Sequence, residues 1–158
     1  MKILAIDPSP DKHAWVLWDT ETHDFYGARM GMHTAEDLHG VLYDSATPEL
    51  VAVEFPQNYG VAVGLSVLAT AFEAGRIAAT LYGPPLALYG RPTIKGQIGG
   101  RNDPEIRASL RMRHGEAKKG HKLYGVKNDI WAALALAVAI DENPNLRRVE
   151  WGGIRSAV

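Results

Sequence analysis

Three acidic residues stand where separate segments of the chain could bring their carboxylates together. Asp7 follows the apolar run 3–6, Glu54 follows the apolar run 50–53, and Asp129 falls in the first turn of a predicted helix. If the two runs are neighbouring strands, both carboxylates emerge at one edge of the sheet. Hard divalent cations prefer such oxygen ligands. Two cations there could activate a water molecule and stabilise the leaving oxygen of a phosphodiester.

Each acid also has an ordinary explanation. Asp7 precedes Pro8 and could shape a turn. Glu54 could be a strand-end charge, and Asp129 could complement a helix dipole. Occurring together, in an order that suits one topology, they favour a metal site more strongly than any of them does alone.

The apolar and turn patterns predict an α/β fold, with a mixed five-stranded sheet flanked by helices. Strands are expected over residues 2–7, 12–18, 25–32, 49–54 and 86–89. The first three would form an antiparallel meander, and the others would add parallel strands. Helices are expected from residue 34, over 61–82, over 104–113 and over 129–141, the last one capped by Asn128. Residues 90–102 are expected to form a loop, and 115–126 a link rich in lysine and glycine.

Charge is divided unevenly along the chain. Residues 91–128 contain ten basic and three acidic residues, a net charge of +7, whereas the rest contains seven and fifteen, a net charge of −8. A basic segment of this kind suits a face that meets a polyanion, although a solvated helical surface would have the same composition.

Length and composition indicate one globular domain over residues 1–142, followed by a loose tail over 143–158. The chain has no cysteine, which excludes disulfides and thiolate metal ligands. No apolar stretch suits a membrane span, and we expect a cytoplasmic protein with no membrane partner.

Around the three acids, the sequence resembles the RuvC-type Holliday junction resolvases of the RNase H-like superfamily. The resemblance rests on segments 3–8 and 15–17, 51–57, 75–79, 85–89 and 91–95, and 127–137, whose order and spacing carry it over residues 1 to about 140. It implies an RNase H-like fold.

By this resemblance, Asp7, Glu54 and Asp129 match three of the four acidic metal ligands of the family. Lys95 matches a basic catalytic residue in the loop that faces the scissile strand. Where the family has its fourth acid, one helical turn after Asp129, this chain has Ala132. Water or another acid, such as Asp11, would have to take that role.

The implied function is a Mg²⁺-dependent endonuclease, with Mn²⁺ as a substitute, that nicks two symmetric strands of a four-way DNA junction. The implied assembly is a homodimer, and the Ala-rich helix over 61–82 is its candidate interface. Phe55 or Tyr59 would correspond to the aromatic side chain that probes the junction. Further DNA contacts are expected at Arg91, Lys95, Arg101, Arg107, Lys118, Lys119, Lys122 and Lys127.

Three other functions fit parts of the pattern. An actin-like or sugar-kinase ATPase also begins with a strand that ends in Asp, but it needs two such domains and a second phosphate loop. A non-catalytic DNA-binding relative is compatible with Ala132. A nuclease of broader branched or flap DNA would have the same sequence features.

Overall fold

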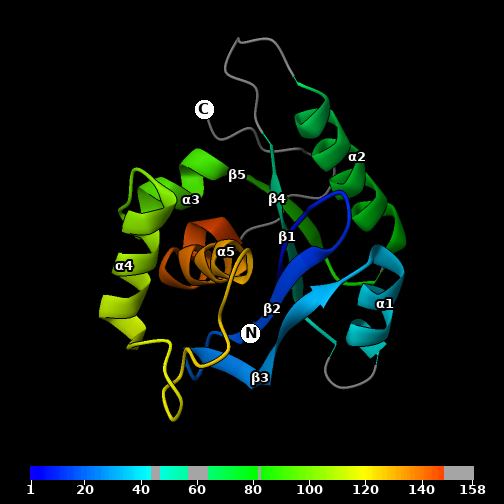
Figure 1. The fold of residues 1–158 in the computed structure, drawn as a ribbon. Coiled ribbons are helices and arrows are strands. Elements are labelled where there is room, and N and C mark those ends of the chain that lie inside the picture. Colours follow the sequence, from blue (N-terminus) through cyan, green and yellow to red (C-terminus); the bar gives the residue numbers. More distant parts are fainter. Residues whose placement is uncertain (44–46, 57–63, 82, 148–158) are drawn as a thin grey trace.

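The computed structural model describes residues 1–43, 47–56, 64–81 and 83–147. Its centre is a five-stranded sheet with the strand order β3-β2-β1-β4-β5 (Figure 1). The strands are β1 (Lys2–Asp7), β2 (His13–Asp19), β3 (Asp24–His33), β4 (Leu50–Phe55) and β5 (Leu86–Gly90). The first three form an antiparallel meander, and β4 and β5 continue the sheet in parallel with β1. This confirms the predicted mixed sheet.

The register of β1 and β4 places the first two acids side by side. Ile6 pairs with Val53 in the parallel ladder. Asp7 and Glu54 are the next residues on each strand, so they lie side by side at the carboxyl ends of β1 and β4. Pro8 follows Asp7 and has no backbone N–H with which to extend the ladder.

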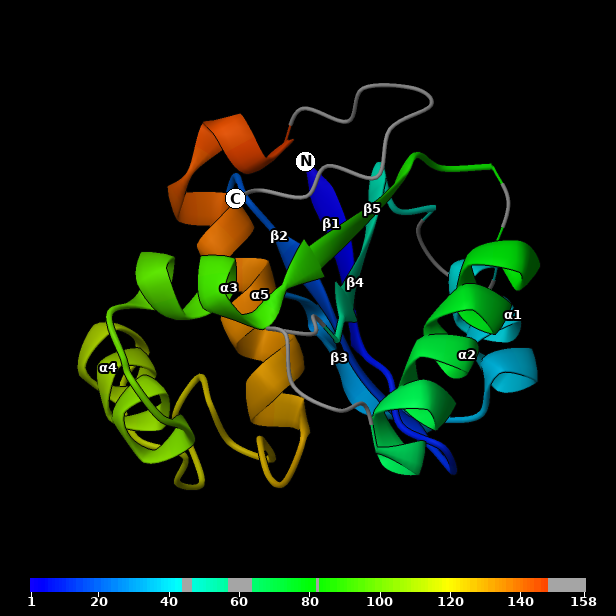
Figure 2. The ribbon, with the colours of Figure 1, turned by 90° about the horizontal axis from the view of Figure 1, so that it is seen from above.

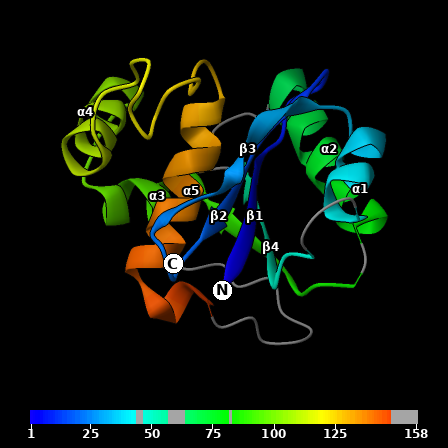
Figure 3. The same cartoon turned by 90° about the horizontal axis from the view of Figure 1, so that it is seen from below.

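Helices cover both faces of the sheet. On one face lie α1 (Ala35–Tyr43) and α2 (Leu65–Thr80), and on the other lie α3 (Arg91–Ile98), α4 (Asp103–His114) and α5 (Ile130–Glu142), as Figures 2 and 3 show. Each face has its own hydrophobic core, because alternate residues of the central strands point to opposite sides.

Helix α5 is the centre of the larger core. Eleven of its thirteen residues are buried, which fits a helix that is apolar on every side. It lies between the sheet and α4 (Figure 1). Two small residues, Ala133 and Ala137, are among those that contact neighbouring elements. The helix thereby brings its N-terminus to the edge at which β1 and β4 end.

Two local expectations were wrong. The segment expected to be a loop over 90–102 contains helix α3, because Ile94 and Ile98 are buried on one side of it and Pro92 is accepted in its first turn. Asn128 does not cap α5: it has a positive φ of 48°. Asp129 occupies the N-cap position, without a side-chain capping hydrogen bond.

The start of the expected tail is ordered against the domain. Residues Pro144–Arg147 form a 3₁₀ helix. Tyr89 donates a hydrogen bond to the Leu146 carbonyl, and Arg147 pairs with buried Asp141. Among the helices of the described ranges, none has the length and apolar character to cross a bilayer.

Candidate metal and nucleic-acid site

The three acids predicted from the sequence line one pocket of about 230 Å³ at the edge where β1 and β4 end. Strands β1 and β4 supply Asp7 and Glu54, and the start of α5 supplies Asp129. The full lining consists of Asp7, Glu54, Arg91, Asp103, Ile106, Arg107, Asn128, Asp129, Trp131 and Ala132. The structure therefore brings the predicted acids together, and adds a fourth acid and two arginines.

The electrostatics of the pocket are those of carboxylates placed close together. The pKa of Asp7 is raised to about 8, mainly by burial and next by the negative charge of Glu54, against the opposing effect of Arg91 and with a smaller contribution from Asp129. A buried carboxyl among like charges is relieved by a bound cation. Hard oxygen donors and this excess of negative charge fit a magnesium-type ion.

Arg91 forms a bridge inside this pocket. Its Nη1 lies 2.7 Å from Glu54 Oε2, and its Nη2 lies 2.6 Å from Asp103 Oδ1. Burial raises the pKa of Glu54, and the guanidinium opposes that rise. The hydrogen bond from Arg91 lowers the pKa of Asp103. Arg91, which was predicted as a DNA contact, thus serves as the counter-ion of two carboxylates.

No three acidic or histidine side chains in the described ranges are arranged to hold a metal ion as they stand. The bridge gives a reason, because Glu54 directs a carboxylate oxygen at Arg91. The donor set fits a divalent cation, but the Glu54 oxygen that faces Arg91 can contribute to it only after Arg91 moves.

Ala132 lines the pocket one turn after Asp129 and offers no oxygen ligand. Asp11, the candidate substitute, is exposed in the turn between β1 and β2 and is not part of the lining. The additional acid is Asp103, at the start of α4. The sequence analysis missed it. The available signal was an acid beside Pro104 in a predicted first helical turn, and nothing there indicated its contact with Arg91.

The predicted DNA contacts fall into different environments. Arg107 lines the acid pocket, and its Nε is buried without a hydrogen-bond partner in the described ranges. Lys95 lies on α3, outside the lining, and its Nζ donates to the Arg101 carbonyl at 3.3 Å. Four of the predicted DNA contacts are exposed to solvent: Arg101, Lys118, Lys119 and Lys127.

Lys122 is turned inward. Its Nζ lies 4.8 Å from the centre of the Trp18 ring, 3.6 Å from an Asp24 oxygen, and donates to the His23 carbonyl. These contacts tie the link between α4 and α5 to the sheet, whereas the sequence analysis grouped Lys122 with Lys118 and Lys119 as a DNA contact.

The two candidate aromatic probes differ in what the structure describes. Phe55 ends β4, is partly buried, and packs against the core beneath α1 and α2. Tyr59 lies outside the described residues.

No protein-family model and no curated protein matches the sequence. Solved structures do match. A Thermus thermophilus RuvC in complex with a Holliday junction substrate aligns with a TM-score of 0.66 and 16% identity, over 92% of this chain and 96% of that one. A second T. thermophilus RuvC structure aligns with a TM-score of 0.64 and 19% identity, over 93% and 97% of the two chains.

These alignments span nearly the whole of both chains. The chain therefore has the RNase H-like fold of the RuvC Holliday junction resolvases.

Proposed function

We propose that this chain is a metal-dependent endonuclease that resolves four-way DNA junctions by paired nicks. The observation that carries the proposal is the meeting of Asp7, Glu54 and Asp129 in one pocket at a sheet edge. The fold supports it, since a solved neighbour is a RuvC bound to a Holliday junction substrate.

In this proposal Asp7, Glu54 and Asp129 hold Mg²⁺, for which Mn²⁺ can substitute. The bound ions would supply an activated water and neutralise charge on the leaving oxygen. Asp129 is exposed, so it can reach an ion at the mouth of the pocket, and partly buried Asp7 can hold one deeper. The unpaired Nε of Arg107 offers a donor to a phosphate oxygen. We assign Lys95 a supporting role through its charge, because it lies outside the lining.

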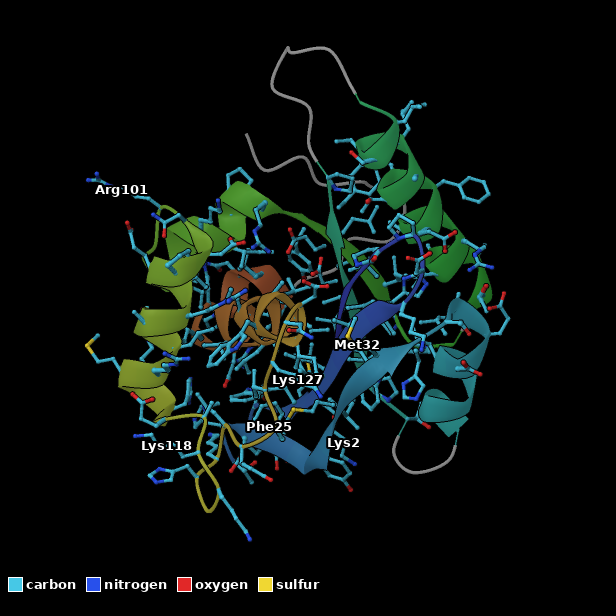
Figure 4. The ribbon with its side chains drawn as sticks, in the orientation of Figure 1. Lys2, Phe25, Met32, Arg101, Lys118 and Lys127 are labelled. Atoms are coloured by element: carbon cyan, nitrogen blue, oxygen red, sulfur yellow. The ribbon has the colours of Figure 1, made fainter. Side chains whose placement is uncertain are left out.

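The exposed basic residues give the DNA backbone a surface beside the pocket. Arg101 precedes α4, and Lys118, Lys119 and Lys127 follow it in the link to α5. Figure 4 shows Arg101 and Lys118 at opposite ends of α4, which places positive charge along that side of the molecule. Phosphate contacts of this kind position the duplex without reading its sequence.

Paired nicks require two pockets, and α2 offers the surface for a second copy of the chain. Leu65, Leu68 and Phe72 are 86%, 54% and 71% exposed and lie on one helical face. Large apolar side chains gathered on one face are typical of a protein interface. A homodimer that covers this face would nick both symmetric strands.

The function is tested with a labelled four-way junction, a flap substrate and a linear duplex, each with and without Mg²⁺. We expect symmetric nicks in the junction that need the metal, and none from Asp7→Asn, which should still bind DNA. Binding without cleavage at any Mg²⁺ or Mn²⁺ concentration would favour a non-catalytic DNA-binding protein. Equal cleavage of flaps would favour a broader nuclease. We place this activity in the cytoplasm, which cell fractionation checks.

A further inference from the structure

A second cavity lies beside the acid pocket, and of its lining only Lys127 has a role in the function proposed above. It is an open groove of about 880 Å³ between β3 and the link that leads into α5, and we call it the β3 groove. It is lined by Lys12, Phe25, Met30, Gly31, Met32, Gly120, His121, Lys122, Tyr124, Gly125, Lys127, Asn128 and Ile130. Figure 4 labels three of these residues, Phe25 and Met32 on β3 and Lys127 in the link.

The walls of the β3 groove are apolar and aromatic. Met30 and Met32 are partly buried side chains of β3 that pack against the hydrophobic core on the α5 side of the sheet. Tyr124 stands on the opposite wall, and 59% of its surface is exposed. Methionine adapts to the shape of a flat ligand, and an exposed tyrosine ring offers it a stacking face.

The rim of the β3 groove is positively charged. Lys12 and Lys127 are exposed, and neither forms an ion pair within the described ranges. The lining contains no acidic residue. Lysines beside an aromatic face suit a ligand that combines an apolar ring with a phosphate.

The β3 groove also adjoins the acid pocket. Asn128 lines both cavities, and its positive φ carries the backbone from the groove into the start of α5. If a phosphate of a DNA strand lay at the carboxylates of the acid pocket, the neighbouring nucleotide of that strand would pass beside Asn128 and reach the β3 groove.

We propose that the β3 groove binds one unpaired nucleobase of the DNA strand beside the scissile phosphate, with Tyr124 as its stacking face. This rests on the proposed function, and it deepens that function by assigning a site for an unstacked base. A base at a branch point lacks one of the stacked neighbours that a linear duplex provides, so it unpairs at lower cost, and the groove would contribute to selection of branched DNA.

The test uses four-way junctions that carry 2-aminopurine at the nucleotide on either side of the cut. Wild type, Tyr124→Ala and Tyr124→Phe are compared in the Asp7→Asn background, which prevents cleavage during the measurement. We expect binding to quench the fluorescence at one of the two positions, and Tyr124→Ala to lose that quenching with about tenfold weaker junction binding. Tyr124→Phe keeps the ring, so its affinity should stay within about twofold of wild type.

Met112→Ala is the matched control, because Met112 is 83% exposed on α4 and lies outside the groove. It should change neither quenching nor affinity. Equal junction binding and quenching by Tyr124→Ala and wild type would overturn the proposal and leave the nuclease function intact. If the groove instead held a peptide or a second copy, Tyr124→Ala would also leave junction binding unchanged. Failure of every variant, wild type included, to bind the junction would count against both proposals.

Discussion

The Arg91 guanidinium lies between Glu54 and Asp103 and forms an ion pair with each. It therefore competes with a metal ion for the Glu54 carboxylate. Hydrogen bonds to charged groups contribute about 1.5–3 kcal/mol, which a metal that takes the same oxygen of Glu54 must replace. A guanidinium displaced from Glu54 would remain beside the pocket and could then meet a phosphate.

We therefore expect Arg91→Gln to bind Mn²⁺ about tenfold more tightly than wild type in the absence of DNA. Calorimetric titration of the metal measures this directly. Arg107→Gln is the matched control, because Arg107 also lines the pocket but has no ion pair with Glu54. Equal gains in the two variants would mean that net charge, and not the release of Glu54, governs metal affinity.

Asp7 should make the metal-free protein less stable as the pH rises. Its pKa is raised from 3.8 to about 8 in the folded state, mainly by burial. The folded chain then retains a proton that the unfolded chain has lost, so the free energy of unfolding should fall between about pH 4 and about pH 8. Asp7→Asn removes this contribution.

Urea unfolding in EDTA over that pH range provides the measurement. The stability of Asp7→Asn relative to wild type should increase with pH and level off above about 8. The comparison with this variant matters, because His13 and His114 have lowered pKa values and reduce stability at acidic pH in both proteins. A constant difference between the two curves would contradict the raised pKa.

Ala132 lines the pocket at the place where a carboxylate could join Asp129. Ala132→Asp should lower the Mg²⁺ concentration needed for half-maximal cleavage, provided that circular dichroism shows an intact fold. If the requirement is unchanged, Asp103 already supplies that charge. Asp103→Asn would then raise the requirement, and adding Ala132→Asp to it would restore the wild-type value.

At the scale of elements, the strands were predictable because an apolar run and a turn residue mark each one locally. Helix α3 was not, because Gly90, Arg91 and Pro92 suggest a loop, whereas burial of Ile94 and Ile98 in the folded chain favours the helix. The predicted acids follow strand ends and a helix start, so topology brings them together. The contact of Arg91 with Glu54 joins residues 37 positions apart, and no local pattern reveals it.

Helix α2 should mediate a dimer through its exposed apolar face. Replacing Leu68 and Phe72 together with glutamate would place charge in the interface, and we expect a dimer to become a monomer in analytical ultracentrifugation. The monomer should keep its circular dichroism spectrum and lose coordinated nicking. Met112→Glu, which places a charge on exposed α4, should stay dimeric. A wild-type chain that sediments as a monomer at micromolar concentration would refute the α2 interface.

At the scale of the whole molecule, the +7 charge of residues 91–128 is not all available to DNA. Arg91 neutralises two carboxylates, Arg113 pairs with Glu142, and Lys122 is held against the Trp18 ring. The free charge is concentrated at exposed positions, including Lys118 and Lys119. Part of the basic segment therefore stabilises the fold, and the remainder is the surface that we propose for phosphate contacts.

Lys118 and Lys119 should accordingly differ from Lys122 in what they control. Changing the first two to glutamine should weaken binding to junction and duplex alike, and reduce the slope of log K against log salt by about 2, since each phosphate contact contributes about 0.9. Lys122→Gln should leave that slope nearly unchanged and lower the melting temperature, because it removes the contacts with His23 and Trp18. Filter binding at several salt concentrations and thermal unfolding separate the two effects. An unchanged slope in Lys118→Gln/Lys119→Gln would show that the link is a solvated surface, and the DNA path would then have to follow α4 alone.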